Sequence, residues 1–330
     1  MPVPLKAGEV LRNRYKIHRI IGQGGIGCIY LADDLRLEGR LCALKEVEND
    51  RSLPPELLKQ AREQFLREAT VLARLDHPNL PKVSDFFSVG NRDYLVMDYV
   101  PGKDLRTLMH EAKQAGEFLV ESDVLNWAGQ LCDALSYLHN QEPPILHRDI
   151  KPSNLKLTPS GLIKLVDFGL VKVLAPGEVT VTILQGQGTA LYTPLEQYGG
   201  DSGHTDLRSD IYAFGATLYH MLTNKAPVDA RERFLYPESL IPPSQINPDI
   251  SPRTERAVLW AMNLHPDERP ASVALFRQSL LNDQTSPPRP APPRITRTRL
   301  RDVLRARPER ALLILIILLT IFSLIASLAH

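Results

Sequence analysis

Three short segments of this 330-residue chain combine residue types that could do chemistry together. A glycine-rich segment, Gly22-Gln23-Gly24-Gly25-Ile26-Gly27, comes first, His147-Arg148-Asp149-Ile150-Lys151-Pro152-Ser153-Asn154 follows, and Asp167-Phe168-Gly169 comes last. Glycines let a backbone approach phosphate oxygens, a carboxylate can accept a proton, and carboxylate and amide oxygens are suitable ligands for Mg²⁺. Together and in this order, the segments indicate phosphoryl transfer from ATP.

With these segments, the chain resembles the eukaryotic-like (bacterial-type, Hanks-type) Ser/Thr protein kinases from about Val10 to about Leu281. The resemblance implies an α+β, bilobal fold for a kinase domain over 10–282. A small antiparallel β-sheet and a helix C would form the N-lobe at about 10–98, and helices would dominate the C-lobe at about 101–282. It also implies ATP and Mg²⁺ as cofactors and protein substrates as partners.

The resemblance assigns the transfer step to a few side chains. Asp149 would accept the proton of the substrate hydroxyl, and Lys151 would contact the γ-phosphate. Lys45, which follows the apolar run 42–44, would hold the α- and β-phosphates. An amphipathic helix over 65–75 carries Glu68, which would pair with Lys45. The metal ligands would be Asn154 and Asp167.

The elements around the glycines are expected to form the nucleotide pocket. Strand-like residues 15–21 precede the glycines, and β-branched Ile29 follows them, which argues against the strand-to-helix turn of a dinucleotide-binding fold. By resemblance, Met97 lies behind the adenine, the backbone of Asp98 and Val100 binds the base, and Asp104 reaches the ribose. The full ATP-binding prediction comprises Ile21, Gly22, Gly24, Gly27, Ile29, Ala43, Lys45, Glu68, Asp98, Val100, Asp104 and Lys156.

Lys156 departs from the family pattern, which usually places an apolar side chain at this position as the floor of the adenine pocket. Alternation along Leu155-Lys156-Leu157 puts the two leucines on the core side. We therefore expect the methylene stem of Lys156 to cover the adenine while its ammonium group reaches water. The alternative is a lysine that is merely exposed at the edge of the cleft.

Control is expected between Asp167 and Glu196. Arg148 precedes the catalytic aspartate, a pattern associated with activation by loop phosphorylation, and Thr180 and Thr182 are the candidate acceptors. These threonines could equally be ordinary solvated loop residues. By resemblance, Thr189 belongs to the substrate loop, Arg269 pairs with Glu196 in a Pro-Leu-Glu variant of the usual Ala-Pro-Glu, and buried Asp210 tethers the catalytic loop.

Bulk composition excludes several other classes of function. A net charge of +1 gives no reason to expect a nucleic acid as partner. The three cysteines, Cys28, Cys42 and Cys132, are far apart without CxxC spacing. This argues against a disulfide framework or a zinc site and is typical of a reducing compartment.

The last part of the sequence has a different composition. Residues 283–310 are rich in Pro and Arg and predict a semi-rigid juxtamembrane linker. Residues 311–329 carry no charge and, at about 1.5 Å per residue, would form a helix about 28 Å long, close to the thickness of a bilayer core. A helix docked on the domain is the alternative, but such a helix normally has a polar face.

The flank of this apolar segment predicts its orientation. Seven arginines and two acidic residues lie between Arg294 and Arg310, so the positive-inside rule places the preceding domain in the cytoplasm. We therefore expect a single-pass protein with a C-terminal anchor in the cell membrane and the lipid bilayer as partner. Thr320 and Ser323 could support a homodimer by helix pairing, although no GxxxG is present.

Two rival functions remain open from the sequence. A pseudokinase would act as a membrane-tethered binding or scaffold protein, but pseudokinases typically lose the lysine or an aspartate that this chain retains as Lys45, Asp149 and Asp167. A small-molecule kinase of related fold, such as one acting on aminoglycosides, generally lacks the combination of Thr189, Glu196, Asp210 and Arg269.

Overall fold

The computed structural model describes residues 3–24, 27–48, 54–167, 172–173, 190–198 and 206–281. The chain divides into two compact units, 1–287 and 288–330, and every described residue belongs to the first. Within the described ranges no helix is both long and apolar enough to cross a bilayer. The apolar segment 311–329 lies outside them.

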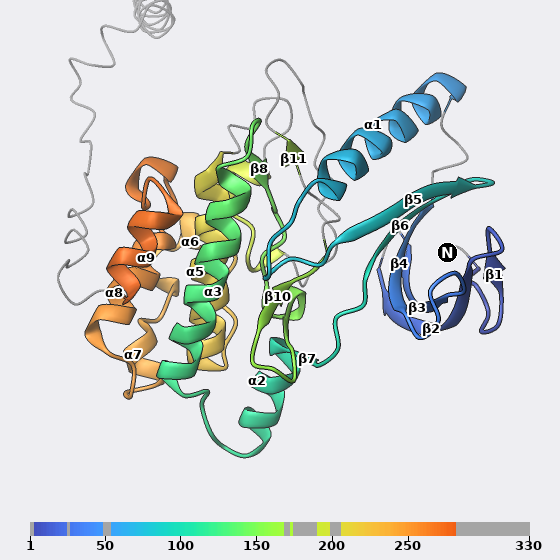
Figure 1. Cartoon of the computed structure of the whole chain (residues 1–330). Coiled ribbons are helices and arrows are strands. Elements are labelled where there is room, and N and C mark those ends of the chain that lie inside the picture. The colour runs from blue at the N-terminus through green and yellow to red at the C-terminus, as the bar shows by residue number, and fades with distance from the viewer. Residues whose placement is uncertain are drawn as a thin grey trace, which may run out of the picture. The chain divides into compact units, whose positions relative to one another are not determined.

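A six-stranded antiparallel sheet forms the N-lobe (Figure 1). Its strand order is β1-β2-β3-β4-β6-β5. The strands are β1 (Val10–Leu11), β2 (Tyr15–Gln23), β3 (Cys28–Asp34), β4 (Leu41–Glu48), β5 (Val83–Val89) and β6 (Arg92–Asp98). Along β4, Cys42 and Leu44 enter a small core with Tyr30 and Tyr94, whereas Ala43 joins the large core shared with the helical lobe. Alternation therefore directs Lys45 to the same side as Ala43.

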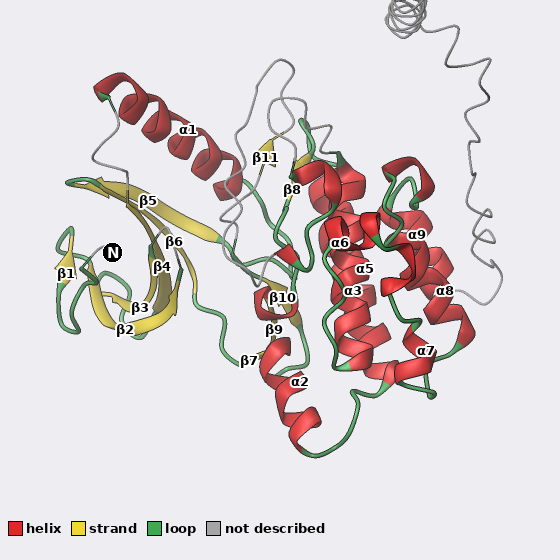
Figure 2. Ribbon diagram, turned by 180° about the vertical axis from the view of Figure 1, so that it is seen from behind, coloured by secondary structure: helices red, strands yellow, loops and turns green. Residues whose placement is uncertain are grey.

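Helix α1 (Pro55–Ala73) runs beside β5 in both views (Figures 1 and 2). Pro55 occupies its first turn, where a missing N–H costs nothing. Ala69 and Leu72 are buried, and Pro78 prevents the chain from continuing the helix after its cap at Arg74. The helix predicted over 65–75 exists, but it begins ten residues earlier and ends two residues sooner.

Helices dominate the C-lobe, drawn in red in Figure 2. Helix α5 (Leu207–Thr223) is buried over almost its whole length, and its buried residues include polar Ser209, Asp210 and Thr217. It packs beside α3 (Glu121–His139) and α8 (Pro252–Ala261). The ring of Phe214 on α5 meets the ring of Phe276, which lies on α9, edge to face at 5.2 Å. The remaining helices are α2 (Leu105–Gln114), α6 (Ala230–Leu235), α7 (Pro243–Ile246) and α9 (Val273–Leu281).

Two small sheets support the segments that carry the motifs. One has the order β10-β9-β7, formed by Ile163–Leu165, Leu155–Leu157 and Lys103–Asp104; the other pairs β11 (Lys172–Val173) with β8 (Ile145–Leu146). Val166 N–H donates to the carbonyl of Asn154 at 2.8 Å, which brings the end of the 147–154 loop beside Asp167. The expected α+β arrangement of a small antiparallel sheet and a mainly helical lobe is confirmed.

Candidate active site

The carboxylate of Asp149 is held on one side only. Its Oδ2 accepts hydrogen bonds from Lys151 Nζ at 2.8 Å and from Asn154 Nδ2 at 2.9 Å. Its Oδ1 is buried and has no hydrogen-bond partner within the described part of the chain. A buried acceptor without a donor is costly unless another molecule supplies one. The arrangement therefore leaves one oxygen of Asp149 for an incoming hydroxyl group.

Asp210, fully buried on α5, anchors the loop that carries Asp149. Its carboxylate accepts from the N–H of His147 at 2.9 Å and from that of Arg148 at 2.8 Å, and His139 Nε2 lies 2.9 Å from Oδ2. Burial alone would raise the pKa of Asp210, but the contact with His139, the charge of His147 and the backbone donor outweigh it and lower the pKa. An ionised Asp210 therefore fixes the backbone immediately before Asp149.

Two non-glycine residues beside the site have left-handed backbones: Arg148 has φ 66° and Asp167 has φ 69°. This region is uncommon for residues that carry a Cβ atom, and the strain persists only where surrounding contacts impose it. The bonds of Asp210 supply that constraint at Arg148. The strained positions lie at the catalytic loop and at the end of β10, where the motifs were found.

Lys45 on β4 forms an ion pair with Asp167, which follows β10 of the C-lobe. Burial would raise the pKa of Asp167, but the charge and hydrogen bond of Lys45 outweigh that effect and lower the pKa. We expected Glu68 to be the partner of Lys45, and the structure pairs Lys45 with Asp167 instead. Glu68 Oε1 accepts a hydrogen bond from Gln64 Nε2 at 3.1 Å. Burial lowers the pKa of Arg148, and the negative charge of Glu68 raises it. The turn of α1 that carries Glu68 is thus oriented toward the catalytic loop.

Asn154 and Asp167 each carry a hard oxygen atom, and the hydrogen bond from Val166 N–H to the Asn154 carbonyl brings the two segments together. The amide nitrogen of Asn154 donates to the carbonyl of Asp149 at 2.8 Å and to its Oδ2, which leaves the amide oxygen as the group that could bind a cation. Among the described residues no cluster of three or more His, Cys, Asp or Glu side chains could hold a metal. Mg²⁺ needs no such cluster when it is shared with phosphates, so the pair fits this ion.

Two glycines of the glycine-rich segment, Gly24 and Gly27, differ in the space that a Cβ atom would find. At Gly27 a Cβ atom would lie 2.0 Å from the carbonyl oxygen of Glu46, so the packing of the protein itself requires glycine. At Gly24, whose N–H donates to the Gly27 carbonyl at 3.0 Å, a Cβ atom would meet nothing within 4 Å. Space above Gly24 is what the close approach of a phosphate group requires.

The remaining residues of the predicted nucleotide pocket line the junction of the lobes. Ile21 and Ile29 pack against the large core that contains Ala43, Met97 and Leu155. In the hinge, Asp98 N–H donates to the carbonyl of Lys82 at 2.9 Å, and Val100 is buried. Gly22 lies opposite Ile29 in the β2–β3 register. Asp104 caps α2 by accepting from Thr107 N–H at 2.9 Å, which fixes its carboxylate at this edge.

Lys156 lies in the middle strand of the small sheet, with Asp104 and Lys164 as its cross-strand neighbours. Its Nζ is 5.7 Å from the centroid of the Tyr99 ring. Burial lowers the pKa of Lys156, the charge of Asp104 opposes that shift, and the charge of Arg19 adds to it. The side chain is partly exposed, and the ammonium group keeps solvent-accessible surface beside the hinge tyrosine, as expected.

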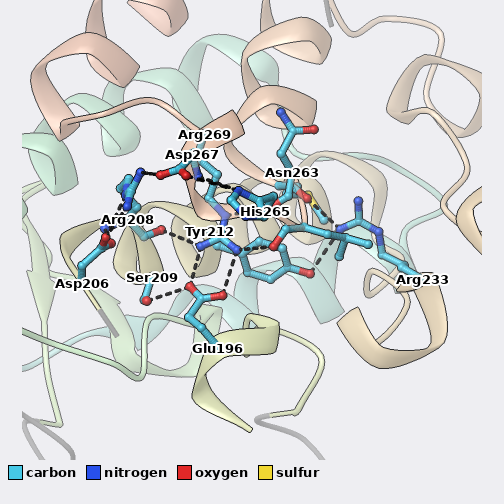
Figure 3. Close-up of polar contacts among 12 residues, drawn as sticks. Glu196, Asp206, Arg208, Ser209, Tyr212, Arg233, Asn263, His265, Asp267 and Arg269 are labelled. Atoms are coloured by element: carbon cyan, nitrogen blue, oxygen red, sulfur yellow. Dashed lines mark hydrogen bonds and ion pairs between the residues drawn. The ribbon is translucent and has the colours of Figure 1, made fainter. Parts of the chain in front are cut away.

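Arg269 and Glu196 form a bidentate ion pair at 2.6 and 3.0 Å (Figure 3). The guanidinium group has no exposed surface, lies 4.9 Å from the centroid of the Tyr212 ring, and also donates to the carbonyls of Asn263 and Leu264. Ser209 Oγ donates to Glu196 Oε1 at 2.8 Å. These bonds fix Glu196 to the C-lobe, and the pairing with Arg269 is the one that the resemblance implied.

Some predicted residues lie outside the described ranges: Thr180, Thr182, Thr189, Phe168 and Gly169. Conversely, the motifs did not point to His139, Ser209, Tyr99 or Tyr212, each of which contacts a predicted residue. For His139 a signal existed, because this polar residue follows Leu135 and Leu138 on the buried face of α3. The other three contacts join segments distant in sequence and carry no local pattern.

Comparison with known proteins agrees with this geometry. A family model described as protein kinase domain matches residues 15–281. A probable serine/threonine-protein kinase of Clostridium acetobutylicum is 35% identical over 268 residues, which cover 79% of this chain and 38% of that protein. Serine/threonine-protein kinase PknB of Mycobacterium tuberculosis is 33% identical over 301 residues, which cover 87% of this chain and 45% of PknB. The chain thus spans less than half the length of these curated relatives.

Solved structures give the same result. The apo form of PpkA-294 matches with a TM-score of 0.66 at 26% identity and covers 84% of this chain and 99% of its own. The kinase domain of Mycobacterium tuberculosis PknI matches with a TM-score of 0.62 at 28% identity, and the match covers 84% of this chain and 98% of the PknI domain.

Proposed function

This chain belongs to the protein kinase domain family, alongside bacterial serine/threonine kinases, and we propose that it transfers the γ-phosphate of ATP to serine and threonine hydroxyls of proteins. The observation that carries the proposal is the convergence of Lys45, Asp149, Asn154 and Asp167 from separate segments. Lys45 reaches Asp167, Asn154 bonds to Asp149, and Val166 bonds to Asn154, so one connected set of contacts joins all four.

In the transfer step, the substrate oxygen forms a bond to the γ-phosphorus while the bond from that phosphorus to the bridging oxygen of ADP breaks. The proton of the hydroxyl group passes to Oδ1 of Asp149, the oxygen without a described partner. Lys151, which already donates to Asp149, balances charge on the transferred group, and Lys45 contacts the phosphates that stay with ADP.

Mg²⁺ would be held by Asn154 and Asp167, and when bound it neutralises charge on the β- and γ-phosphates. The lowered pKa of Asp167 keeps its carboxylate ionised at neutral pH, which a metal ligand requires. The ion pair with Lys45 keeps that carboxylate at the cleft before any nucleotide arrives.

The test is phosphoryl transfer by the purified full-length chain. We would incubate it with γ-labelled ATP, Mg²⁺ and a mixed protein substrate, and in parallel with an aminoglycoside. Label on phosphoserine and phosphothreonine supports the proposal. Label on the aminoglycoside alone would identify a small-molecule kinase, and ATP binding without any transfer would identify a pseudokinase.

We also propose activation by phosphorylation at Thr180 or Thr182. Support comes from Arg148, the residue immediately before Asp149, whose side chain is buried and whose backbone N–H donates to Asp210. A phosphate carries nearly two negative charges and pairs strongly with a guanidinium group. Mass spectrometry after autophosphorylation should find phosphate at one or both threonines. Its absence from both in active protein would contradict this part of the proposal.

Membrane anchoring through 311–329 is a separate proposal that rests on the uncharged run and its arginine-rich flank. In cell fractionation, the full chain should remain with membranes after a high-salt wash, whereas a chain ending at Arg310 should be released. Equal behaviour of the two chains would rule out the anchor. Homodimer formation through Thr320 and Ser323 stays a prediction that the same two chains can test by cross-linking.

A further inference from the structure

The hydroxyl group of Tyr198 joins two segments that are distant in the sequence. It donates a hydrogen bond to the carbonyl of Ala190 at 3.0 Å, and it lies 3.1 Å from Oδ2 of Asp229, which can accept the same proton. Tyr198 follows the short 3₁₀ helix Leu195–Gln197, and Asp229 directly precedes α6. One side chain therefore ties the start of the described segment 190–198 to the N-terminal end of α6.

Asp229 has contacts of its own that fix its carboxylate beside this hydroxyl group. It caps α6 by accepting from Arg231 N–H at 2.8 Å, and it forms an ion pair with the Arg231 guanidinium group at 3.0 Å. That guanidinium group also lies over the Tyr198 ring, 4.3 Å from its centroid. Burial, together with the charge of Asp229, raises the pKa of Tyr198. The hydroxyl group therefore keeps the proton that it donates.

Ala190 is the residue next to Thr189, which the resemblance assigns to the substrate loop. Its carbonyl accepts from Thr193 N–H at 3.2 Å in addition to the hydroxyl group of Tyr198. The first of these bonds is a local turn within the segment, whereas the second reaches a side chain held by α6. The bond from Tyr198 thus fixes the point at which the chain leaves the substrate loop.

Helix α5 fixes the middle of the same segment relative to the catalytic loop. Tyr192 Oη lies 2.6 Å from Nδ1 of His220 on α5. Thr217 lies three residues earlier, about one helical turn away, and its Oγ1 is 3.2 Å from the carbonyl of Ile150, the residue after Asp149. One helix thus supports both the proton acceptor and the middle of this segment, while the first residue of the segment depends on another contact.

We propose that Tyr198 is a positioning residue for the protein substrate, an inference that rests on the proposed function. Its hydroxyl group, held by Asp229, fixes the Ala190 carbonyl and with it the end of the loop against which the polypeptide around the acceptor hydroxyl group binds. Without this bond the loop is ordered only when substrate binds, and that cost lowers the affinity for the substrate. The cluster shares no residue with the predicted nucleotide site, so the affinity for ATP does not change.

The test is steady-state transfer by the full-length chain to casein and to myelin basic protein, with the KM for protein and the KM for ATP measured separately. Tyr198→Phe keeps the ring beside Arg231 and removes only the hydroxyl group, and we expect the KM for protein to rise about fivefold. The KM for ATP and kcat should stay within about twofold of the wild type.

Two substitutions at Asp229 test the other end of the contact. Asp229→Ala removes the acceptor and should raise the KM for protein about threefold, with no change in the KM for ATP. Asp229→Asn keeps an oxygen atom that can accept from Tyr198 and cap α6, and its KM for protein should stay within about twofold of the wild type.

Tyr219→Phe is the matched control. The hydroxyl group of Tyr219, which is buried on α5, donates to the carbonyl of Ile241 at 2.9 Å. This bond is of the same kind as the one from Tyr198 but involves no residue of the segment 190–198. Its loss should lower the melting temperature by a few degrees, as in Tyr198→Phe, and should leave both KM values unchanged.

Other results would decide against the inference. A wild-type KM for protein in Tyr198→Phe would overturn it. An equal rise of both KM values in Tyr198→Phe, or the same rise for protein in Tyr219→Phe, would also overturn it, because either would indicate a general loss of order in the C-lobe. Failure of the wild type to phosphorylate either protein would instead contradict the proposed function itself.

Discussion

Lys45 and Asp167 form an ion pair that joins β4 of the N-lobe to the second residue after β10 of the C-lobe. The two residues are 122 positions apart in the sequence, and no local pattern links them. Their contact brings a phosphate-binding cation and a metal-binding carboxylate together before nucleotide is present. Lys45 is expected to contact the phosphates of the nucleotide, and Asp167 is expected to contact Mg²⁺. We therefore expect nucleotide binding to weaken or break this ion pair.

Removal of either partner should impair transfer far more than folding. Lys45→Met and Asp167→Asn should each lower kcat by at least about 100-fold, because charge stabilisation in the transition state is lost. Both side chains are partly exposed, so the melting temperature should change by only a few degrees. Steady-state kinetics and thermal melts measure the two effects. A variant that retained more than a tenth of the wild-type kcat would contradict the assigned roles.

The two glycines of the nucleotide segment should respond differently to alanine. Gly27→Ala forces a Cβ atom against the Glu46 carbonyl and should lower the free energy of unfolding by about 1–3 kcal/mol. Gly24→Ala meets open space, so its stability should stay within about 0.5 kcal/mol of the wild type while its KM for ATP rises. Urea unfolding and KM measurements separate these outcomes. An unchanged KM in Gly24→Ala would exclude close approach of the phosphates there.

The pair of Glu196 and Arg269 should matter for stability, because the guanidinium group is completely buried. Arg269→Met leaves the carboxylate of Glu196 without its partner, and we expect unfolding to become easier by about 3–5 kcal/mol. Lys103→Met, which breaks the exposed pair with Glu111, should change stability by less than about 1 kcal/mol. Urea denaturation compares the two, and equal losses would show that burial of the Glu196 pair contributes nothing.

His220 should make stability depend on pH in mildly acidic solution. Burial lowers its pKa from 6.5 to about 4, and Tyr192 Oη lies 2.6 Å from its Nδ1. Between these two values the unfolded chain binds a proton that the folded chain does not, so stability falls as the pH falls. His220→Gln should reduce that slope by up to about 1.4 kcal/mol per pH unit. Urea midpoints from pH 4 to pH 7 provide the comparison, and identical slopes would contradict this account.

Sequence reasoning located the catalytic loop well because its chemistry depends on local spacing. Asp149, Lys151 and Asn154 lie within six residues, and their mutual hydrogen bonds follow from one short turn. The positions of Ala43 and Lys45 were expected from the resemblance alone, and the structure places Ala43 in the large core and pairs Lys45 with Asp167. The pairing of Arg269 with Glu196 was also expected, although only from the resemblance to a family.

The features that sequence reasoning missed depend on how separate helices and strands pack against one another. Glu68 is on the expected helix, but the position of α1 relative to β4 decides whether it meets Lys45, and no periodicity encodes that position. Lys156 Nζ lies 5.7 Å from the centroid of the Tyr99 ring, a contact between segments that are distant in the sequence. The threonines at 180, 182 and 189 lie outside the described residues, so their assignment stays a prediction.

The most direct test of the central claim is the transfer rate of Asp149→Asn in the full-length chain. We predict a fall of about 10²–10⁴-fold in kcat, with ATP affinity within about threefold of the wild type, since the amide cannot accept the substrate proton. Transfer by Asp149→Asn at the wild-type rate would show that the four converging side chains are not the site of catalysis.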